Sequence, residues 1–392
     1  MRIAFYAPLK PPTHAVPSGD RRVARLLINA LVKTGHNVEL ASTLRTYEPA
    51  GDENAQARLR DESAQIANDL VARWSGAGRD ERPGLWFTYH VYYKAPDWIG
   101  PSVAAALGIP YVIAEPSFAP KRAAGRWAMG HAAAGESIRA ASLMLCPIRD
   151  DVACLEPLLA DGGAIRLLPP FLDPGPYRDA SRNRDANRKT LAAEFDLDPS
   201  VPWIVVAAMM RSGDKAASYS ILASVLRRLA DLPWRIVVAG EGAARSGIEA
   251  AFESAAPGRN RFLGELGPDA LAALYSACDL CIWPAVNEAY GMALLEAQAT
   301  GVPVVSMAVR GVPDVVCDGR TGLLAPPQNQ DALADLAREL LVDGERRRKM
   351  GREAAHFAQF ERSADAAAAT LELALRELTS ADSVLQRKPV QP

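Results

Sequence analysis

Short apolar runs bounded by glycine or proline alternate with alanine-rich helical stretches along almost the whole chain. Such runs are typical of buried parallel strands, and the stretches between them are typical of helices that cover both faces of a sheet. The pattern therefore predicts a doubly wound α/β fold. The predicted strands are residues 2–7, 37–42, 84–90, 110–115, 142–147 and 165–170, followed by 203–210, 234–240, 259–266, 280–285, 302–308 and 321–327.

A break in this pattern divides the chain into two domains. The stretch DPGPYRDASRNRDANR crowds Pro, Arg, Asp and Asn ahead of a short helix, which is typical of an interdomain linker. At 392 residues the chain also exceeds the size at which single cores usually stop growing. The predicted organisation is a first domain at 1–178, a linker at 179–200, a second domain at 201–362, and at 363–392 a helix that crosses back to the first domain and a frayed polar tail.

Composition and charge narrow the function classes. A formal net charge of -2 and a pI near 6.3 give no field that would draw the chain to phosphates, so we expect no nucleic-acid partner. The five cysteines are odd in number and scattered, which argues against a disulfide framework and favours a reducing, cytoplasmic compartment. The first apolar run is too short for a signal peptide, and the longest runs are too short to span a bilayer. Membrane contact is therefore expected only as a peripheral one, at the inner face.

The segment ADLCIWPAVNEAYGMALLEAQATGVPVVSM places a loop between a strand and a helix. Glu288 lies in the loop at the carboxyl edge of the sheet, where doubly wound folds bind ligands, and Glu296 lies in the helix. The backbone of Tyr290, Gly291 and Met292 opens this helix, whose unpaired N–H groups and positive dipole end favour a phosphate. Taken alone, two glutamates beside a helix are more often a solvated face.

Three neighbouring strand ends carry related signals. Arg211 and Lys215 follow the strand at 203–210 and place two cations at the same edge, where together they can hold a diphosphate. Gly240 ends the next strand in the turn AGEG, which brings backbone close to a ligand. Gly264 lies at a strand end where a nucleobase could rest on backbone and aliphatic surface. Each of these signals, taken singly, also fits ordinary surface charge or a turn.

The order of the motifs is more informative than any one of them. From MMRSGDK through AGEG, FLGEL and NEAYGMALLE to GVPDVVCDGRTGLL, the chain resembles the retaining family-4 glycosyltransferases of the GT-B fold over nearly its whole length. The resemblance implies two Rossmann-like domains facing a cleft and a nucleotide diphosphate donor, either a UDP-sugar or GDP-mannose. It implies transfer of a hexose to a glycan, lipid-linked or small-molecule acceptor without a cofactor or a metal. The donor base and sugar, the acceptor and the oligomeric state stay open.

The same resemblance assigns roles to individual residues. Glu288 would hydrogen-bond the hydroxyls of the donor sugar, and Glu296 would hold the ribose of the nucleotide. Arg211 and Lys215 would clamp the diphosphate as it leaves. The other positions that the resemblance assigns to the donor site are Gly19, Gly240, Gly264, Tyr290, Gly291 and Met292.

The first domain carries the remaining family features. PSGDRRVARLL resembles the family's glycine loop, with Gly19 in place and Ser18 where a second glycine is usual. His90 ends a strand where the family often carries a histidine facing the reacting sugar, so it is a catalytic candidate; the alternative is a partly buried strand-end histidine. Glu115, where relatives often have histidine, is a further candidate. The residues expected to shape an acceptor pocket are Tyr89, Tyr92, Tyr93 and Lys94.

Several alternatives remain open beside this interpretation. Asp196 and Asp198 could suggest a metal-dependent sugar transferase, although their place near the linker favours turn carboxylates. Cys278 and Cys281 form a CxxC without a second pair, which favours small core residues over a zinc site. The basic stretch 120–135 fits an exposed helix or a contact with an anionic membrane or lipid-linked acceptor. Rival functions are an epimerase or phosphorylase on the same scaffold and a non-catalytic nucleotide-sugar-binding scaffold protein.

Overall fold

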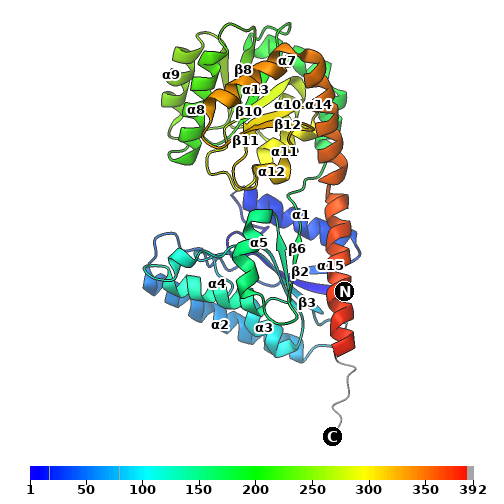
Figure 1. The fold of residues 1–392 in the computed structure, drawn as a ribbon. Coiled ribbons are helices and arrows are strands. Elements are labelled where there is room, and N and C mark those ends of the chain that lie inside the picture. Colours follow the sequence, from blue (N-terminus) through cyan, green and yellow to red (C-terminus); the bar gives the residue numbers. More distant parts are fainter. Residues whose placement is uncertain (17, 79, 386–392) are drawn as a thin grey trace. The chain divides into compact units, whose positions relative to one another are not determined.

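The chain forms two units in the computed structural model, each with its own sheet and core (Figure 1). Unit 1 comprises Met1–Pro169 and the chain from Ala364, and unit 2 comprises Pro170–Ser363. Each sheet has six strands, and all paired neighbours in it run parallel, which confirms the predicted doubly wound α/β class. The predicted frayed tail extends beyond the described part of the chain. That part consists of residues 1–16, 18–78 and 80–385, with side chains up to 378.

Unit 1 arranges its strands in the order β2-β1-β3-β4-β5-β6. Side chains from the strands and the covering helices form a hydrophobic core, in which Trp74 and Trp86 pack edge to face. The strands are β1 (Arg2–Tyr6), β2 (Asn37–Leu40), β3 (Leu85–Val91), β4 (Tyr111–Pro116), β5 (Leu143–Cys146) and β6 (Ala164–Leu167). The helices are α1 (Gly19–Lys33), α2 (Glu53–Ser75), α3 (Gly100–Leu107), η1 (Pro120–Arg122), α4 (Ala128–Ala140), α5 (Arg149–Leu155), η2 (Glu156–Leu158) and α15 (Ala364–Leu385).

Unit 2 arranges its strands in the order β12-β11-β10-β7-β8-β9. The strands are β7 (Trp203–Ala207), β8 (Arg235–Ala239), β9 (Asn260–Gly264), β10 (Leu280–Trp283), β11 (Val304–Met307) and β12 (Gly322–Ala325). The helices are α6 (Gly175–Arg182), α7 (Arg184–Phe195), α8 (Asp214–Arg228), α9 (Arg245–Ala255), α10 (Pro268–Ala277), α11 (Met292–Ala299), α12 (Val312–Val315), α13 (Gln330–Val342), α14 (Gly344–His356) and the π-helical turn η3 (Phe357–Glu361).

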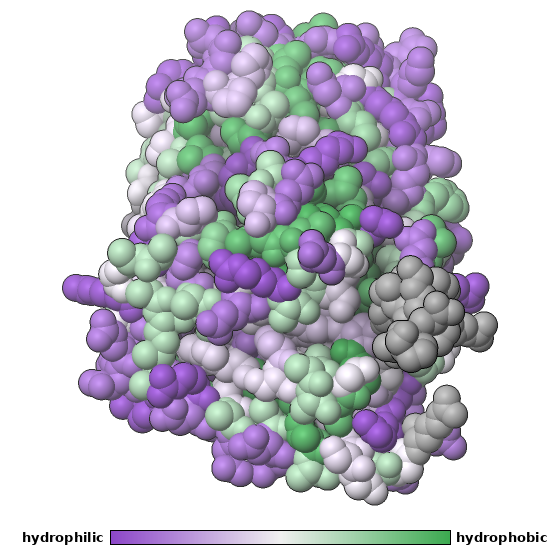
Figure 2. Space-filling model, turned by 60° about the horizontal axis from the view of Figure 1, so that its bottom comes forward, coloured by the Kyte–Doolittle hydropathy of each residue, from purple (hydrophilic) through white to green (hydrophobic). Residues whose placement is uncertain are grey.

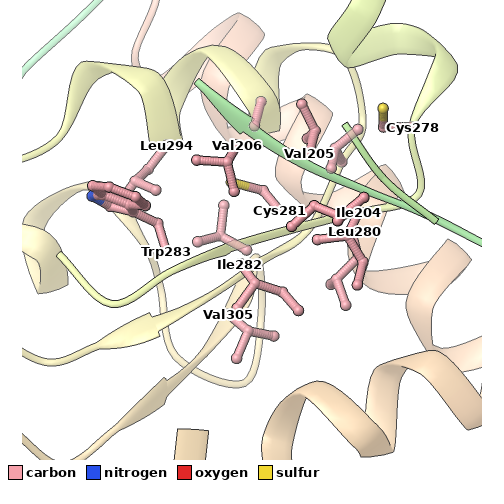
Figure 3. Close-up of a cluster of buried hydrophobic side chains, with 14 of the residues drawn as sticks. Ile204, Val205, Val206, Cys278, Leu280, Cys281, Ile282, Trp283, Leu294 and Val305 are labelled. Atoms are coloured by element: carbon pink, nitrogen blue, oxygen red, sulfur yellow. The ribbon is translucent and has the colours of Figure 1, made fainter. Parts of the chain in front are cut away.

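The inner strands β7, β8, β10 and β11 of unit 2 are buried on both faces, which explains their largely apolar sequences. Figure 3 shows Val206 and Cys281 side by side in this core, with Trp283 toward the carboxyl end of β10. Cys278 and Cys281 are both fully or almost fully buried, and burial raises the pKa of Cys281 to about 12. The CxxC is therefore part of the core, as predicted, because its thiols are held protonated among apolar side chains.

The expected linker differs from the structure. Residues 179–200 form most of α6 and α7, which pack against α10 of unit 2, and the chain divides at Pro169 rather than at 178. The polar composition has a physical reason, because two arginines of α7 form ion pairs with the mostly buried carboxylate of Asp279. Arg184 and Arg188 lie 2.6 and 2.9 Å from the two oxygens of Asp279, and one of these oxygens also accepts the backbone N–H of Trp203.

The last helix belongs to unit 1, in agreement with the predicted return of the chain to the first domain. Helix α15 packs along α1, where Lys33 pairs with Asp365. Farther along, Glu372 lies 2.9 Å from His36, and Glu377 lies 3.1 Å from Arg166 of β6. Polar contacts thus fix α15 to the first domain's own elements at three points along the helix.

None of the helices within the described residues is both long and apolar enough to cross a membrane. Hydrophilic side chains are widespread on the face drawn in Figure 2, with smaller hydrophobic areas between them.

Candidate functional site

The strand order places the predicted donor residues at one point of unit 2. Strands β7 and β10 are neighbours, but the chain leaves β7 toward β8 on one side and leaves β10 toward β11 on the other. Loops that diverge in this way open a crevice at the carboxyl edge, which is where doubly wound sheets bind ligands. Lys215, in the first turn of α8, follows β7, and Glu288 follows β10.

Lys215 and Glu288 form an ion pair at this crevice. Their side chains are only 18% and 19% exposed, and the Lys215 Nζ also lies 5.5 Å from the centroid of the Trp283 ring. A Lys side chain held by an aromatic face and one carboxylate keeps N–H donors available for an incoming anion. The carboxylate in turn is a hydrogen-bond acceptor suited to sugar hydroxyls.

The loop that carries Glu288 is held in an uncommon conformation. Ala285 and Asn287 have left-handed φ values of 60° and 51°, which non-glycine residues rarely adopt. Helix α8 holds the loop, because Ser218 accepts the Val286 N–H at 3.0 Å and Asp214 accepts the Asn287 side-chain N–H at 3.0 Å. The strain is thus concentrated beside Glu288, as is common at functional sites.

Helix α11 begins directly after this loop. Gly291, with a φ of 78°, precedes its first residue, and no side chain caps the helix. A Cβ at this position would come within 3.0 Å of Leu294 and 3.4 Å of Glu288, so the glycine allows a close turn. Tyr290 and Met292 are half-buried on either side of it. The open N–H groups of α11 therefore lie next to the ion pair, in the arrangement that suits a phosphate.

The turn after β8 passes very close to the loop after β7. A Cβ on Gly240, whose φ is 140°, would lie 2.0 Å from the carbonyl oxygen of Ala208. The Gly240 N–H donates to the carbonyl of Gly264 at 2.7 Å, which joins the ends of β8 and β9. Only glycine fits between these two backbones.

A cavity of about 200 Å³ opens between these turns and α11. Glu296 lines it from α11 and is only 5% exposed. The other lining residues are Ala207, Ala208, Met209, Ala239, Gly240, Glu265, Leu266, Leu271, Tyr275 and Ala293. The cavity is mostly apolar with a single buried acid, which is a typical composition of a small-molecule site.

Two predicted donor residues stand apart from the pair. Arg211 lies in the same β7–α8 loop, but its exposed side chain makes no hydrogen bond or ion pair within the described residues. Gly264 adjoins the ion pair of Glu241 and Arg245 rather than Lys215. The structure therefore brings together Lys215 and Glu288, and links Gly240 to Gly264.

The two candidates of the first domain, Gly19 and His90, lie in unit 1. Strands β1 and β3 are neighbours there, and the loops after them diverge in the same way as those in unit 2. Gly19 opens α1 after β1, with open space where a side chain would be. His90 Nδ1 lies 3.2 Å from Asp20 and 3.8 Å from Glu115. Asp20 was not singled out from the sequence. The signal that could have found it is an acidic residue in the first turn of the helix that follows β1.

Backbone strain accompanies this second cluster too. His90 and Glu115 have left-handed φ values of 62° and 57° at the ends of neighbouring strands β3 and β4. Ring contacts to Tyr89 and Tyr92, at 5.7 and 5.2 Å between centroids, fix the His90 imidazole. The side chains of His90 and Glu115 are mostly buried, with 20% and 18% exposed.

The charge state of His90 gives a first prediction. Burial alone would lower the pKa of His90, but the carboxylates of Glu115 and Asp20 outweigh burial and raise the pKa above its ordinary value of 6.5. The interaction of protonated His90 with these carboxylates therefore contributes fully to the stability of the fold below about pH 6.5. This contribution is lost as the pH rises through the raised pKa of His90. We expect Asp20→Asn to lower the pKa of His90, as measured by NMR titration of its ring protons.

Asp61→Asn is a suitable control for that titration, because Asp61 is an exposed acid on α2 that pairs with Arg60. His90→Gln identifies the resonance among the five histidines. An equal titration midpoint in Asp20→Asn and wild type would contradict the assigned cause.

No group of three or more His, Cys, Asp or Glu side chains that could hold a metal occurs within the described residues. Asp198 binds the backbone N–H and hydroxyl of Ser200 at 2.8 and 2.6 Å, and Asp196 ends α7. These two acids therefore belong to a turn, as the sequence favoured.

Comparison with known proteins places unit 2 in a family. Residues 205–357 match the model of "Glycosyl transferases group 1". The D-inositol 3-phosphate glycosyltransferase of Corynebacterium urealyticum is 36% identical over 143 residues, 35% of this chain and 34% of that protein. The protein of the same name from Segniliparus rotundus is 34% identical over 230 residues, 55% of this chain and 49% of that protein. The chain thus spans about a third to a half of the length of these relatives.

Solved structures extend the likeness to both units. Sucrose-phosphate synthase from Thermosynechococcus elongatus matches with a TM-score of 0.71 at 20% identity, covering 97% of this chain and 99% of that one. Anabaena HepE in complex with UDP matches with a TM-score of 0.70 at 15% identity, covering 96% and 100%. At these identities the likeness concerns the fold. The chain is therefore similar to the group 1 glycosyltransferases over residues 205–357, and it shares the two-domain GT-B fold over both units.

Proposed function

We propose that the protein transfers a sugar from a nucleotide diphosphate donor to an acceptor and that unit 2 holds the donor. The observation that carries the proposal is the Lys215–Glu288 ion pair at the β7/β10 crevice, next to the N-terminus of α11 and the cavity that Glu296 lines. One cation and open helix N–H groups suit a diphosphate, and two carboxylates suit sugar hydroxyls.

Uridine is the proposed base of the donor. The fold neighbour HepE is described in complexes with UDP and with UDP-glucose. In this chain the ribose would lie against Glu296, and the base would rest on the backbone and aliphatic surface from Gly264 to Leu266. Lys215 and Arg211 would hold the two phosphates, with Arg211 free to turn toward them from its exposed position.

A retaining front-face substitution is the proposed mechanism. The bond from the sugar C1 to the phosphate oxygen breaks, and the acceptor oxygen forms its bond to C1 on the same face. The acceptor proton passes to the leaving phosphate oxygen, so no protein nucleophile is required. Because negative charge grows on the diphosphate, Lys215, Arg211 and the α11 N–H groups stabilise the transition state more than the bound donor.

The proposed reaction needs no metal, because these protein groups supply the positive charge that a divalent cation supplies elsewhere. Unit 1 would bind the acceptor at the His90 cluster. The proposed place of action is the cytoplasm. We expect the turnover rate to be the same in excess EDTA and at different Mg²⁺ concentrations. A strict requirement for Mg²⁺ would refute this part of the proposal.

Ligand binding to unit 2 is the direct test. We expect UDP and one UDP-sugar to raise the melting temperature of the wild type without metal, because a ligand that binds only the folded state stabilises it. Glu296→Gln should weaken UDP binding by about 10-fold or more, since it removes a charge-assisted hydrogen bond to the ribose. The screen includes GDP, ADP and their sugar conjugates.

Glu345→Gln is the matched control, because Glu345 is an exposed acid in the first turn of α14. A stronger shift with GDP than with UDP would reassign the base. No shift with any nucleotide would favour a non-catalytic scaffold protein, and epimerised donor without acceptor would favour an epimerase.

A further inference from the structure

Unit 1 carries a cluster of cations and aromatic rings beyond His90, which we call the aromatic–cationic platform. It consists of Tyr93, Lys94, Arg122 and Trp127. Lys94 Nζ lies 4.8 Å from the centroid of Trp127 and 5.9 Å from that of Tyr93, and the Arg122 guanidinium lies 5.6 and 5.3 Å from the same two centroids. The two rings meet edge to face at 5.7 Å. Two like charges are therefore held over one pair of rings.

These two cations have no carboxylate partner. Neither Lys94 nor Arg122 makes an ion pair or a side-chain hydrogen bond within the described residues. Glu48, whose backbone contacts the platform, has its carboxylate already committed to the backbone N–H groups of Ala50, Gly51 and Asp52. Ring contacts orient a cation but leave its N–H donors available for an anion.

The platform is rigidly built. Tyr93 and Lys94 form the tip of a tight turn, closed by hydrogen bonds between Tyr92 and Ala95 at 2.9 and 3.3 Å. The Lys94 carbonyl accepts the Glu48 N–H at 2.8 Å, and the Trp127 indole donates to the Glu48 carbonyl at 3.1 Å. The backbone of one residue, Glu48, therefore fixes both halves of the platform.

Helix packing adds to this rigidity. Gly130 of α4 lies so close to the Tyr93 carbonyl that a Cβ would come within 2.2 Å of it. Gln56 of α2 bonds both the Arg126 carbonyl, at 2.7 Å, and the Gly130 N–H, at 3.1 Å. Cations held in place in this way lose little freedom when a ligand binds, which favours affinity.

An aromatic path joins the platform to the His90 cluster. Tyr93 contacts Tyr92 at 5.5 Å, and Tyr92 contacts His90 at 5.2 Å between ring centroids. A ligand on the platform would thus extend toward the strained end of β3. Two cations match the charge of about -1.5 to -2 that a phosphate monoester carries near pH 7.

We propose that the aromatic–cationic platform binds a phosphate group of the acceptor, so that the accepting sugar or polyol is phosphorylated. This inference rests on the proposed sugar transfer and names the acceptor's class. The phosphate belongs either to a soluble sugar phosphate or to a lipid headgroup that ends in a phosphate monoester, because both offer the same anion to Lys94 and Arg122.

The test measures binding by the full-length chain without a donor. The probes are glucose 6-phosphate, glucose, and phosphatidylcholine vesicles with or without phosphatidic acid, which carries a phosphate monoester. We expect glucose 6-phosphate to bind and glucose not to bind. In the Lys94→Gln/Arg122→Gln double variant, binding should weaken about 10-fold or more, because two charge-assisted contacts are lost. Arg58→Gln, which removes an exposed cation of α2 with no ring contact, should bind like the wild type.

Each outcome has a distinct meaning. Loss of glucose 6-phosphate binding in the double variant supports a soluble sugar phosphate, and an equal loss confined to vesicles with phosphatidic acid supports a lipid headgroup that ends in a phosphate monoester. Unchanged binding in the double variant, or no binding of either probe by the wild type, overturns the proposal. UDP binding is measured on the same samples: its retention in the double variant shows that unit 2 is folded, and its absence from the wild type counts against the proposed function instead.

Discussion

Lys215→Ala should lower turnover by about 100-fold or more while it leaves the protein folded. The Lys215 ammonium is positioned by Glu288 and by the Trp283 ring before any ligand binds, so it stabilises the leaving diphosphate without reorganisation. Removal of one preorganised group of this kind from other enzymes typically costs about 10² to 10³ in rate. Because the pair is mostly buried, the loss of the cation leaves the Glu288 carboxylate without this partner and should cost about 1 to 3 kcal/mol of stability.

Turnover is measured as the rate of UDP release. The donor in this assay is the UDP-sugar that raises the melting temperature of the wild type. Lys349→Ala provides the control, because Lys349 is an exposed lysine of α14 in the same unit. Arg211→Ala should also be slow, since Arg211 is the second cation of the loop. If Lys215→Ala and Arg211→Ala both turn over at the wild-type rate, the assignment of the donor site is wrong.

The strands of both sheets could be predicted because buried parallel strands leave a simple record. The side chains of the inner strands face apolar surroundings on both sides, so the sequence shows apolar runs there that end near Gly or Pro. The run at 203–210 is longer than β7, which ends at Ala207. The last residues of that run leave the strand: the backbone N–H groups of Ala208 and Met210 donate to the carbonyls of Ala239, which ends β8, and of Glu241 in the turn after it.

The boundary between the units could not be read from composition. Arginine and aspartate are frequent in linkers, but here Arg184 and Arg188 neutralise Asp279 across α7 and the loop before β10. An ion pair between residues about ninety positions apart leaves no local pattern. Folded helices and a flexible linker therefore have similar sequences at 179–200.

The location of the site could be predicted from the sequence, but the direct contacts between its side chains could not. Strand ends of a parallel sheet lie at one edge, so Lys215 and Glu288 could be assigned to the same crevice from the sequence. Their direct contact depends on β7 and β10 being neighbours, and that order is a property of the whole sheet. The contact of Asp20 with His90 likewise depends on β1 lying beside β3, which is why Asp20 was missed.

Gly240→Ala should be the most destabilising of the single substitutions considered for the donor site. A Cβ at this position would lie 2.0 Å from the Ala208 carbonyl oxygen, and the φ of 140° is one that L side chains rarely adopt. The collision is with backbone, so the β7 and β8 turns must move apart and the Gly240–Gly264 hydrogen bond must lengthen. Strain and overpacking together should cost about 2 to 5 kcal/mol.

Gly247→Ala separates this effect from the general effect of adding a methyl group. Gly247 lies in α9 of the same unit, with an ordinary φ and no atom within 4 Å of the added Cβ. Alanine in a helix should there stabilise by about 0.5 to 1 kcal/mol. The urea midpoint of the transition that UDP shifts gives both values, and UDP affinity should fall only in Gly240→Ala. Equal stability and UDP affinity in the two variants would mean that the close approach of the β7 and β8 turns neither strains the fold nor shapes the cavity.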